Sequence, residues 1–415
     1  MPEPTEEQAR QQISEALGAG RPIVLAPGPR ELPAEAPPAP DEEWELPNGM
    51  AWVYRGEGNE RLTRPVILAD GFNSGPSELP FSWEFLENGP YPFISELRRR
   101  GRDVVLLGFR ERSASIIDNA QAAQAAVQEA ISRREGDAPL VVGGFSMGGL
   151  VTRYALADLE RKRMNHQTAL YFSYDSPHRG AWIPIGLQAF AHYIRPLNAA
   201  FSDQMNSPAA QQLLWQHISE WNGKPETHED RTNFLAALRR VGDWPNIPRK
   251  IGVANGAGDG SGQGIRPGTL AFAGKGLAVV GTKLYTQGSG DGQLVGELRV
   301  VTIPKHEIRT PAFPEMDGAP GGTLEGFGIL ADALNEKPPI LGLKSEAVLR
   351  AHCFVPAVSA VAIRDIDDQA KLHVNINGLD PSESELDEFK VASQNEAHTL
   401  VTEELCGWII ERLPQ

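Results

Sequence analysis

The pentapeptide GFSMG at residues 144–148 constrains the fold of this chain more than any other stretch. The apolar run Leu140–Val142 in front of it predicts a buried strand, and the apolar residues that recur at helical spacing after Met147 predict a helix. A GxSxG pattern at such a junction is typical of a sharp strand-to-helix turn, which strains the serine and exposes its hydroxyl. The sequence therefore predicts that Ser146 is a nucleophile.

Strand and helix patterns alternate along the chain on both sides of this turn. The predicted strands cover residues 51–56, 65–70, 104–109, 140–142, 169–174 and 250–254. The predicted helices cover residues 91–100, residues 116–134 and the segment that begins at Met147. Such alternation predicts an α/β fold whose mostly parallel sheet is flanked by helices on both faces.

The first 45 residues differ in composition from this alternating core. They are rich in proline and acidic residues, and apart from a short amphipathic pattern at Thr5–Leu17 they predict an extended N-terminal tether. We expect residues 46–415 to form one domain, which closes with a strand at Phe389–Ala392 and a helix at Thr402–Leu413.

Two insertions are expected within this domain. Residues 182–245 carry helix patterns without a strand and predict a helical cap. Residues 265–322 predict a β-rich insertion with a turn at Gln287–Gly292, and its Pro/Gly-rich end at residues 310–322 predicts a loop. Six apolar side chains of the predicted cap are candidates for an acyl pocket: Trp182, Ile183, Ile185, Leu187, Phe190 and Tyr193.

These features resemble the α/β-hydrolase fold serine hydrolases, especially their lipase and esterase branch. A second motif carries the resemblance further: Asp70-Gly71-Phe72 follows a predicted strand and is similar to the His-Gly-Phe of lipases, with Asp70 in place of the histidine. The resemblance implies a Ser-His-Asp triad that forms an acyl-enzyme. It also implies an oxyanion hole made by the backbone N–H groups of Met147 and Phe72.

The family places its general base after the serine and the acid in chain order, in a loop that follows the last strand. His398 lies in such a polar loop, SQNEAH at residues 393–398. His166 precedes any suitable acid, and the predicted cap holds His192, His217 and His228. The resemblance therefore implies His398 as the base.

Two aspartates satisfy the positions at which family members carry the acid. Asp175 ends a predicted strand, in a segment DSPHRG similar to the Thr-Pro-His-x-Gly stretch of bacterial lipases, and Asp259 lies in a glycine-rich turn after the next strand. We favour Asp175 because a continuous strand and Pro177 restrict its movement, and an orienting group must be rigid. Asp259 stays open as the alternative acid, and Asp365 and Asp367 are further candidates.

Charge and missing motifs argue against several other functions. The 39 basic and 54 acidic residues give a net charge of −15, which disfavours nucleic acid or an anionic membrane surface as a partner. The two cysteines match no disulfide framework or zinc spacing, although Cys353 stands where several lipases carry the acid in a similar loop. The glycine-rich stretch at residues 256–264 is followed by Arg266-Pro267-Gly268 rather than by a helix, unlike a dinucleotide loop. We therefore expect no metal and no cofactor.

The sequence has no apolar run long enough to cross a membrane, and its beginning lacks the basic and apolar regions of a signal peptide. We expect a soluble, cytoplasmic protein, or a secreted one if a leader precedes this sequence. The expected partner is a small-molecule or lipid-like ester substrate. Acyltransferases and thioesterases use the same machinery and stay open as alternatives, and a non-catalytic binding protein of the same fold is the alternative from another class.

Overall fold

The largest element of the protein is an eight-stranded sheet with the order β1-β2-β4-β3-β5-β6-β7-β15. The structure is a computed structural model that describes residues 31–276, 279–300, 304–335, 344–364 and 369–415, and residues 7, 8, 11 and 25. β2 runs antiparallel to both of its neighbours, and all other pairs, from β4 to β15, are parallel. This confirms the predicted α/β class. The strands are β1 (Glu42–Leu46), β2 (Gly49–Tyr54), β3 (Pro65–Ala69), β4 (Asp103–Phe109), β5 (Leu140–Phe145), β6 (Thr168–Tyr174), β7 (Arg249–Ala257) and β15 (Glu388–Ala392).

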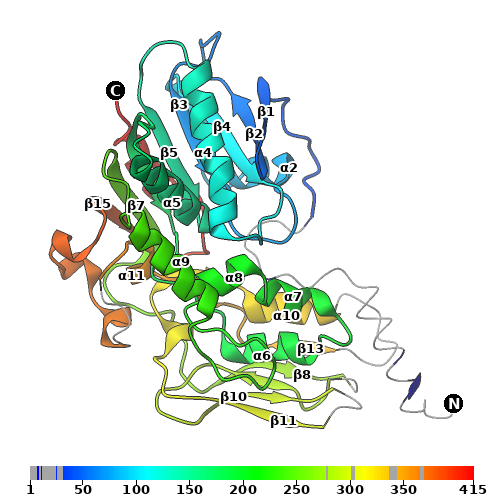
Figure 1. Ribbon diagram of the computed structural model, residues 1–415. Helices are drawn as coiled ribbons and strands as arrows, with labels where there is room; N and C mark the ends of the chain where they lie inside the picture. Colours follow the sequence, from blue (N-terminus) through cyan, green and yellow to red (C-terminus); the bar gives the residue numbers. More distant parts are fainter. Residues whose placement is uncertain are drawn as a thin grey trace.

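Helices cover both faces of this sheet, as the alternating pattern predicted. Val105 and Leu107 of β4 belong to the core on one face, whereas Val104 and Leu106 belong to the core on the other. Because successive strand residues point to opposite faces, an all-apolar strand needs helices on both sides. One face carries α4 (Ile116–Arg133) and α5 (Met147–Arg161) (Figure 1). The other face carries α2 (Leu79–Leu86), α3 (Phe93–Arg99) and α12 (Glu403–Ile410).

Four helices stand between β6 and β7 in the chain, where the helical cap was predicted. They are α6 (Ile185–Tyr193), α7 (Ala199–Met205), α8 (Pro208–Leu213) and α9 (Glu229–Arg240). All six candidates for an acyl pocket in this segment are buried in the main core. The Phe190 ring packs against Phe272 at a centroid distance of 6.2 Å, and the Tyr193 hydroxyl donates to the carbonyl oxygen of Pro304 at 3.0 Å. These side chains therefore pack α6 against the β-rich insertion.

A second, antiparallel sheet has the strand order β11-β10-β9-β8-β13 and lies at the opposite end of the molecule from α4 and α5 (Figure 1). Four of its strands lie within residues 265–322, where the sequence predicts a β-rich insertion, and the expected turn at Gln287–Gly292 separates β9 from β10. β13 comes from beyond residue 322, because α10 returns the chain to the edge of β8. These elements are β8 (Leu270–Gly274), β9 (Lys283–Tyr285), β10 (Gln293–Leu298), β11 (His306–Thr310), α10 (Gly326–Asn335) and β13 (Ser345–Ala347).

Other parts of the fold differ from the sequence-based prediction. β1 begins at Glu42, inside the expected tether, because Trp44 and Leu46 bury alternate side chains against the core, with exposed fractions of 2% and 3%. The expected loop at residues 310–322 ends in β12 (Gly321–Leu324), which pairs antiparallel with β14 (His352–Pro356). The predicted helix at Thr5–Leu17 lies almost entirely outside the described residues. The short helices are η1 (Met316–Gly318), α11 (Ala357–Ala360), η2 (Gln369–His373), η3 (Ile376–Gly378) and η4 (Pro381–Glu383).

Among the described residues, no helix combines the length and the apolar character that crossing a bilayer requires.

Candidate active site

Ser146 stands at the junction of β5 and α5 with a φ of 52° and a ψ of −123°. A positive φ is uncommon for a residue with a side chain, and neighbouring backbone maintains it here. The Ser146 N–H donates to the carbonyl oxygen of Tyr174 at 2.9 Å. Gly148 lets the loop after β3 pass close by, since a β-carbon at this position would lie 2.5 Å from the carbonyl oxygen of Asp70. The chain thus turns sharply from strand into helix at Ser146.

His398 bridges Ser146 and Asp175. Its Nε2 lies 2.8 Å from Ser146 Oγ, and its Nδ1 lies 2.6 Å from Asp175 Oδ2. The exposed fractions of Ser146, His398 and Asp175 are 5%, 2% and 0%. A neutral imidazole satisfies both contacts when Nδ1–H donates to the carboxylate and Nε2 accepts from the hydroxyl. The three residues follow the carboxyl ends of β5, β6 and β15, three strands of one parallel array.

The structure brings Asp175 to His398 and leaves Asp259 away from it. Asp175 directly follows β6 with a φ of 47°, and its N–H donates to the carbonyl oxygen of Val253 at 2.8 Å. The exposed Asp259 accepts instead from the backbone and side chain of Ser261, at 2.8 and 2.9 Å, and these bonds lower the pKa of Asp259. Asp259 is therefore a turn residue. The further candidates Asp365 and Asp367 lie outside the described residues.

Strand order and the turn at Ser146 together decide the architecture. The sheet is mostly parallel with an antiparallel second strand, and a strained serine follows its fifth strand at the start of a helix. The chain has the α/β-hydrolase fold. In this structure the aspartate that contacts His398 follows the sixth strand, β6, and the loop that carries His398 follows the last strand, β15.

No protein-family model and no curated protein sequence matches this chain. Several solved structures are similar to parts of it. The lipase BlEst2 from Bacillus licheniformis, in its mature form, is 14% identical and covers 50% of this chain and 73% of its own, with a TM-score of 0.32. An esterase from Pyrobaculum calidifontis is 11% identical and covers 61% and 75%, with a TM-score of 0.34. An esterase/lipase from an uncultured bacterium is 12% identical and covers 60% and 80%, with a TM-score of 0.30.

The backbone N–H groups of Met147 and Phe72 are the predicted oxyanion donors. Met147 begins α5, and the N–H groups of a first helical turn lack intrahelical partners and favour negative charge. Phe72 lies on the loop after β3, which comes close to Ser146: a β-carbon at Gly71 would lie 3.3 Å from Ser146 Cβ. Among the described residues, neither N–H donates to a protein acceptor. Both are therefore free for a ligand.

Asp70, which replaces the histidine of the lipase motif, holds this loop. Its Oδ1 accepts from the Gly71 N–H at 2.7 Å, and its Oδ2 accepts from the Ser77 hydroxyl at 2.6 Å. Ser77 Oγ in turn accepts from the Phe109 N–H at 2.9 Å, at the end of β4. Arg112 Nη1 lies 3.8 Å from the same Asp70 carboxylate. Asp70 thus ties the start of the loop to a sheet strand.

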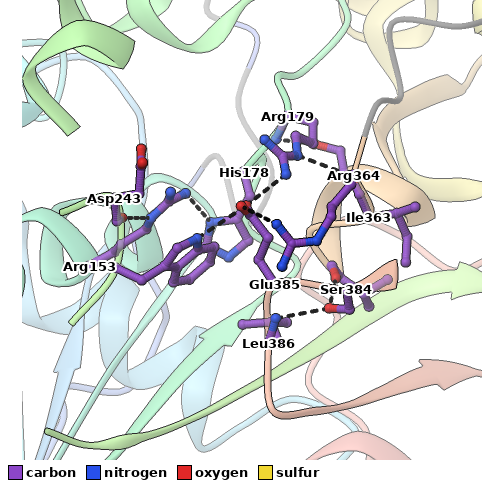
Figure 2. A network of polar contacts seen from close by, with 12 residues as sticks. Arg153, His178, Arg179, Asp243, Ile363, Arg364, Ser384, Glu385 and Leu386 are labelled. Carbon is purple, nitrogen blue, oxygen red and sulfur yellow. Dashed lines mark hydrogen bonds and ion pairs between the residues drawn. The ribbon is translucent and has the colours of Figure 1, made fainter. Parts of the chain in front are cut away.

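A second polar network anchors the segment that follows Asp175 (Figure 2). His178 Nε2 lies 2.9 Å from Ser173 Oγ, and its Nδ1 lies 3.5 Å from Nη1 of Arg153, whose guanidinium carbon stands 3.6 Å from the centre of the Trp244 ring. Burial, together with the charges of Arg153 and Arg179, lowers the pKa of His178 well below its usual value. This histidine is therefore neutral and structural.

Arg179 extends the network to Glu385. Its Nη2 donates to Glu385 Oε2 at 2.7 Å, and its Nε donates to the carbonyl oxygen of Ile363 at 3.0 Å. The same carboxylate accepts from Arg364 at 3.2 Å and from the Trp244 indole at 3.1 Å (Figure 2). Because these contacts cross between distant segments, they fix the chain that leaves Asp175.

The two-stranded sheet of β12 and β14 covers His398, which the sequence did not indicate. The His398 N–H donates to the carbonyl oxygen of Thr323 at 2.8 Å. The Phe354 ring meets the imidazole edge-to-face, with a centroid distance of 4.8 Å. Cys353, which stands where several lipases carry the acid in a similar loop, is buried, and burial raises the pKa of its thiol well above the usual value. No local pattern marks these contacts, since they depend on pairing between segments far apart in the chain.

Within the described part of the chain, no group of three or more His, Cys, Asp or Glu side chains is arranged to hold a metal ion.

Proposed function

We propose that this protein is a serine hydrolase that cleaves carboxylic esters through an acyl-enzyme. The observation that supports it best is the unbroken contact from Ser146 Oγ through both ring nitrogens of His398 to Asp175. A serine hydroxyl is a weak nucleophile near neutral pH, and a hydrogen-bonded base activates it. The buried carboxylate selects the imidazole tautomer that leaves Nε2 free to take the serine proton.

The proposed reaction has two halves. Ser146 Oγ attacks the ester carbonyl carbon while His398 Nε2 takes the hydroxyl proton, and the tetrahedral intermediate then collapses as His398 returns the proton to the leaving alcohol. In the second half, water attacks the acyl-enzyme and gives its proton to His398. The carboxylic acid leaves as Ser146 recovers that proton, and the Asp175 carboxylate stabilises each imidazolium.

The free N–H groups of Met147 and Phe72 are proposed to hold the oxyanion of both intermediates. Negative charge develops on the carbonyl oxygen during each attack, and preorganised donors stabilise it without reorganisation. Loss of one such donor costs about 100-fold or more in related chemistry. The position of Met147 at a helix N-terminus adds the favourable end of a helix dipole.

We propose that residues 182–245 act as the cap of one hydrolase domain. The Trp182 N–H, at the start of this segment, donates to the carbonyl oxygen of Phe354 at 2.8 Å, and Phe354 contacts His398. The segment also contributes Trp215 to the lining of a small cavity. The remaining lining residues of that cavity are Arg179, Gly180, Pro314, Met316, Pro356 and Leu372.

A panel of p-nitrophenyl esters of increasing acyl length tests the proposed function. Wild type should hydrolyse at least the short esters, and Ser146→Ala should lose about 1,000-fold or more of kcat while keeping its fold. A fluorophosphonate probe should label wild type and not Ser146→Ala. Equal hydrolysis by the two proteins, or an unlabelled wild type, would overturn the proposal.

A further inference from the structure

Asn255 lies on the one strand of the sheet that borders both loops bearing the partners of Ser146. β7 stands between β6, which leads to Asp175, and β15, which leads to His398. Asn255 is fully buried near the carboxyl end of β7. A residue at this point can contact both loops at once.

Its backbone does so. The Asn255 N–H donates to Asp175 Oδ1 at 3.0 Å, so the carboxylate is held by Asn255 at one oxygen and by His398 at the other. The Asn255 carbonyl oxygen accepts from the Glu396 N–H at 2.8 Å, at the start of the segment that carries His398. Through these two bonds, the single residue Asn255 holds both the Asp175 carboxylate and the start of the segment that carries His398.

The side-chain amide of Asn255 adds two hydrogen bonds, and both need N–H donors because both partners are acceptors. Asn255 Nδ2 donates to Glu396 Oε2 at 3.0 Å and to the carbonyl oxygen of Leu400 at 2.9 Å. These acceptors stand two residues before and two residues after His398. Thr399, between His398 and Leu400, has a φ of 59°, so the turn is strained and depends on its surroundings.

The amide oxygen of Asn255 also indicates that the side chain is present for its N–H donors. Asn255 Oδ1 is buried without a hydrogen-bond partner in the described part of the chain, a situation that costs about 1–3 kcal/mol. An apolar side chain would avoid this cost but would offer no donors. Burial, with the charges of Glu404 and Asp175, raises the pKa of Glu396, and the Asn255 amide acts in the opposite direction by stabilising its carboxylate.

We propose that Asn255 is a positioning residue for the proposed ester hydrolysis, whose side-chain amide clamps both flanks of His398 while its backbone N–H holds Asp175. The inference rests on the proposed function and deepens it. Asn255 touches no reacting atom, and it acts by keeping His398 between Ser146 and Asp175. A displacement of about 1 Å at such a group can cost about 100-fold in rate.

Asn59 offers a matched control. Its Nδ2 donates to Asp103 Oδ1 at 2.8 Å and to the carbonyl oxygen of Gly101 at 3.0 Å, so it too joins a carboxylate to a backbone carbonyl. Asp103 begins β4, at the amino ends of the parallel strands, whereas Ser146 follows the carboxyl end of β5. The two sites therefore lie at opposite ends of the strands. Asn59→Asp and Asn255→Asp each keep the side-chain shape. Each replaces the amide nitrogen and its two N–H donors by an oxygen that can only accept.

The experiment measures kcat and KM of both variants on the same p-nitrophenyl ester, per folded molecule as judged by near-UV circular dichroism. Asn255→Asp should lower kcat about 10- to 100-fold and change KM less than about threefold, because the ester-binding surface is untouched. Asn59→Asp should keep kcat within about twofold, because its two side-chain contacts lie at the amino ends of the parallel strands. Asn255→Ala carries the same prediction as Asn255→Asp if the added charge prevents folding.

A kcat for Asn255→Asp or Asn255→Ala within about twofold of wild type would overturn the inference, and so would an equal loss in Asn59→Asp. Neither result affects the proposed function. That proposal fails separately, when Ser146→Ala retains full activity or wild type is not labelled by fluorophosphonate.

Discussion

The backbone of Gly322 lies directly against the carboxylate of Asp175. A β-carbon at Gly322 would overlap Asp175 Oδ2 and would lie 3.1 Å from His398 Cα. We therefore expect Gly322→Ala to push the carboxylate out of line with the imidazole and to lower kcat about 10- to 100-fold, since orientation of the base depends on it. Steady-state kinetics on a short ester check this. Gly407→Ala is the control, because a β-carbon at Gly407 meets nothing within 4 Å, and its kcat should match wild type.

The aspartate pair gives a sharper test of the acid. Asp175→Asn should reduce kcat by about 1,000-fold or more, because an amide cannot stabilise the imidazolium and favours the wrong tautomer. Asp259→Asn should stay within about twofold of wild type, because asparagine suits an exposed turn as well as aspartate does. Both variants should unfold at nearly the wild-type temperature. A comparable loss in the two variants would contradict the assignment of Asp175.

The Asp70–Ser77 bond predicts a role for a residue that never touches substrate. Ser77→Ala removes the hydroxyl that joins Asp70 to the end of β4, so the Phe72 N–H should be held less firmly. We expect kcat to fall about 10-fold with little change in KM, because the oxyanion forms only in the transition state. Ser74→Ala, on the exposed part of the same loop, should behave as wild type in the same assay. Unchanged kcat in Ser77→Ala would show that the loop holds its shape without the Asp70–Ser77 hydrogen bond.

Stability should depend on pH through Asp317. Burial raises the pKa of this carboxyl to about 6, although it accepts from the Trp182 indole at 2.5 Å and from the Gln287 N–H at 2.7 Å. A folded-state pKa above the unfolded value means that the native state binds the proton more tightly. The contribution of Asp317 to the unfolding free energy should therefore fall as pH rises from about 4 to about 6, by at most about 3 kcal/mol, and stay level above that range.

Urea unfolding of wild type and Asp317→Asn at about pH 4 and about pH 7 measures this contribution. The variant cannot titrate at position 317, so between the two pH values its unfolding free energy should rise more, or fall less, than that of wild type. An equal change in the two proteins would mean that Asp317 carries its charge without penalty. Comparing the change within each protein removes the separate effect of the lost hydrogen bond.

The sheet strands, and the positions of Ser146, Asp175 and His398, follow patterns that are local in the sequence. Ser146, Asp175 and His398 each come directly after or soon after a strand, and parallel strands bring their carboxyl ends to one edge of a sheet. Chain order and strand position therefore suffice to bring them to one region. The choice of Asp175 over Asp259 needed only the contrast between a residue fixed by a strand and one surrounded by glycines.

What escaped prediction depends on pairing between distant segments. β1 was hidden by its acidic, proline-flanked composition, although Trp44 and Leu46 alternate as strand residues do. β12 begins in a Pro/Gly-rich stretch whose strand character appears only when it meets β14. Asn255 and Phe354 carry no motif, because their contacts with the His398 loop exist only once four strands have assembled. Long-range contacts of this kind leave no trace in a short window of sequence.

Ser146 and His398 are separated by 252 residues, and β15 must reach β7 before they meet. During synthesis Ser146 therefore leaves the ribosome long before His398, while residues 182–245 and the second sheet are still being made. A nascent chain that stops before β15 carries a serine with an ordinary alcohol's reactivity. The proposed ester hydrolysis would then appear in a single late step, so that its measurement would report completed folding.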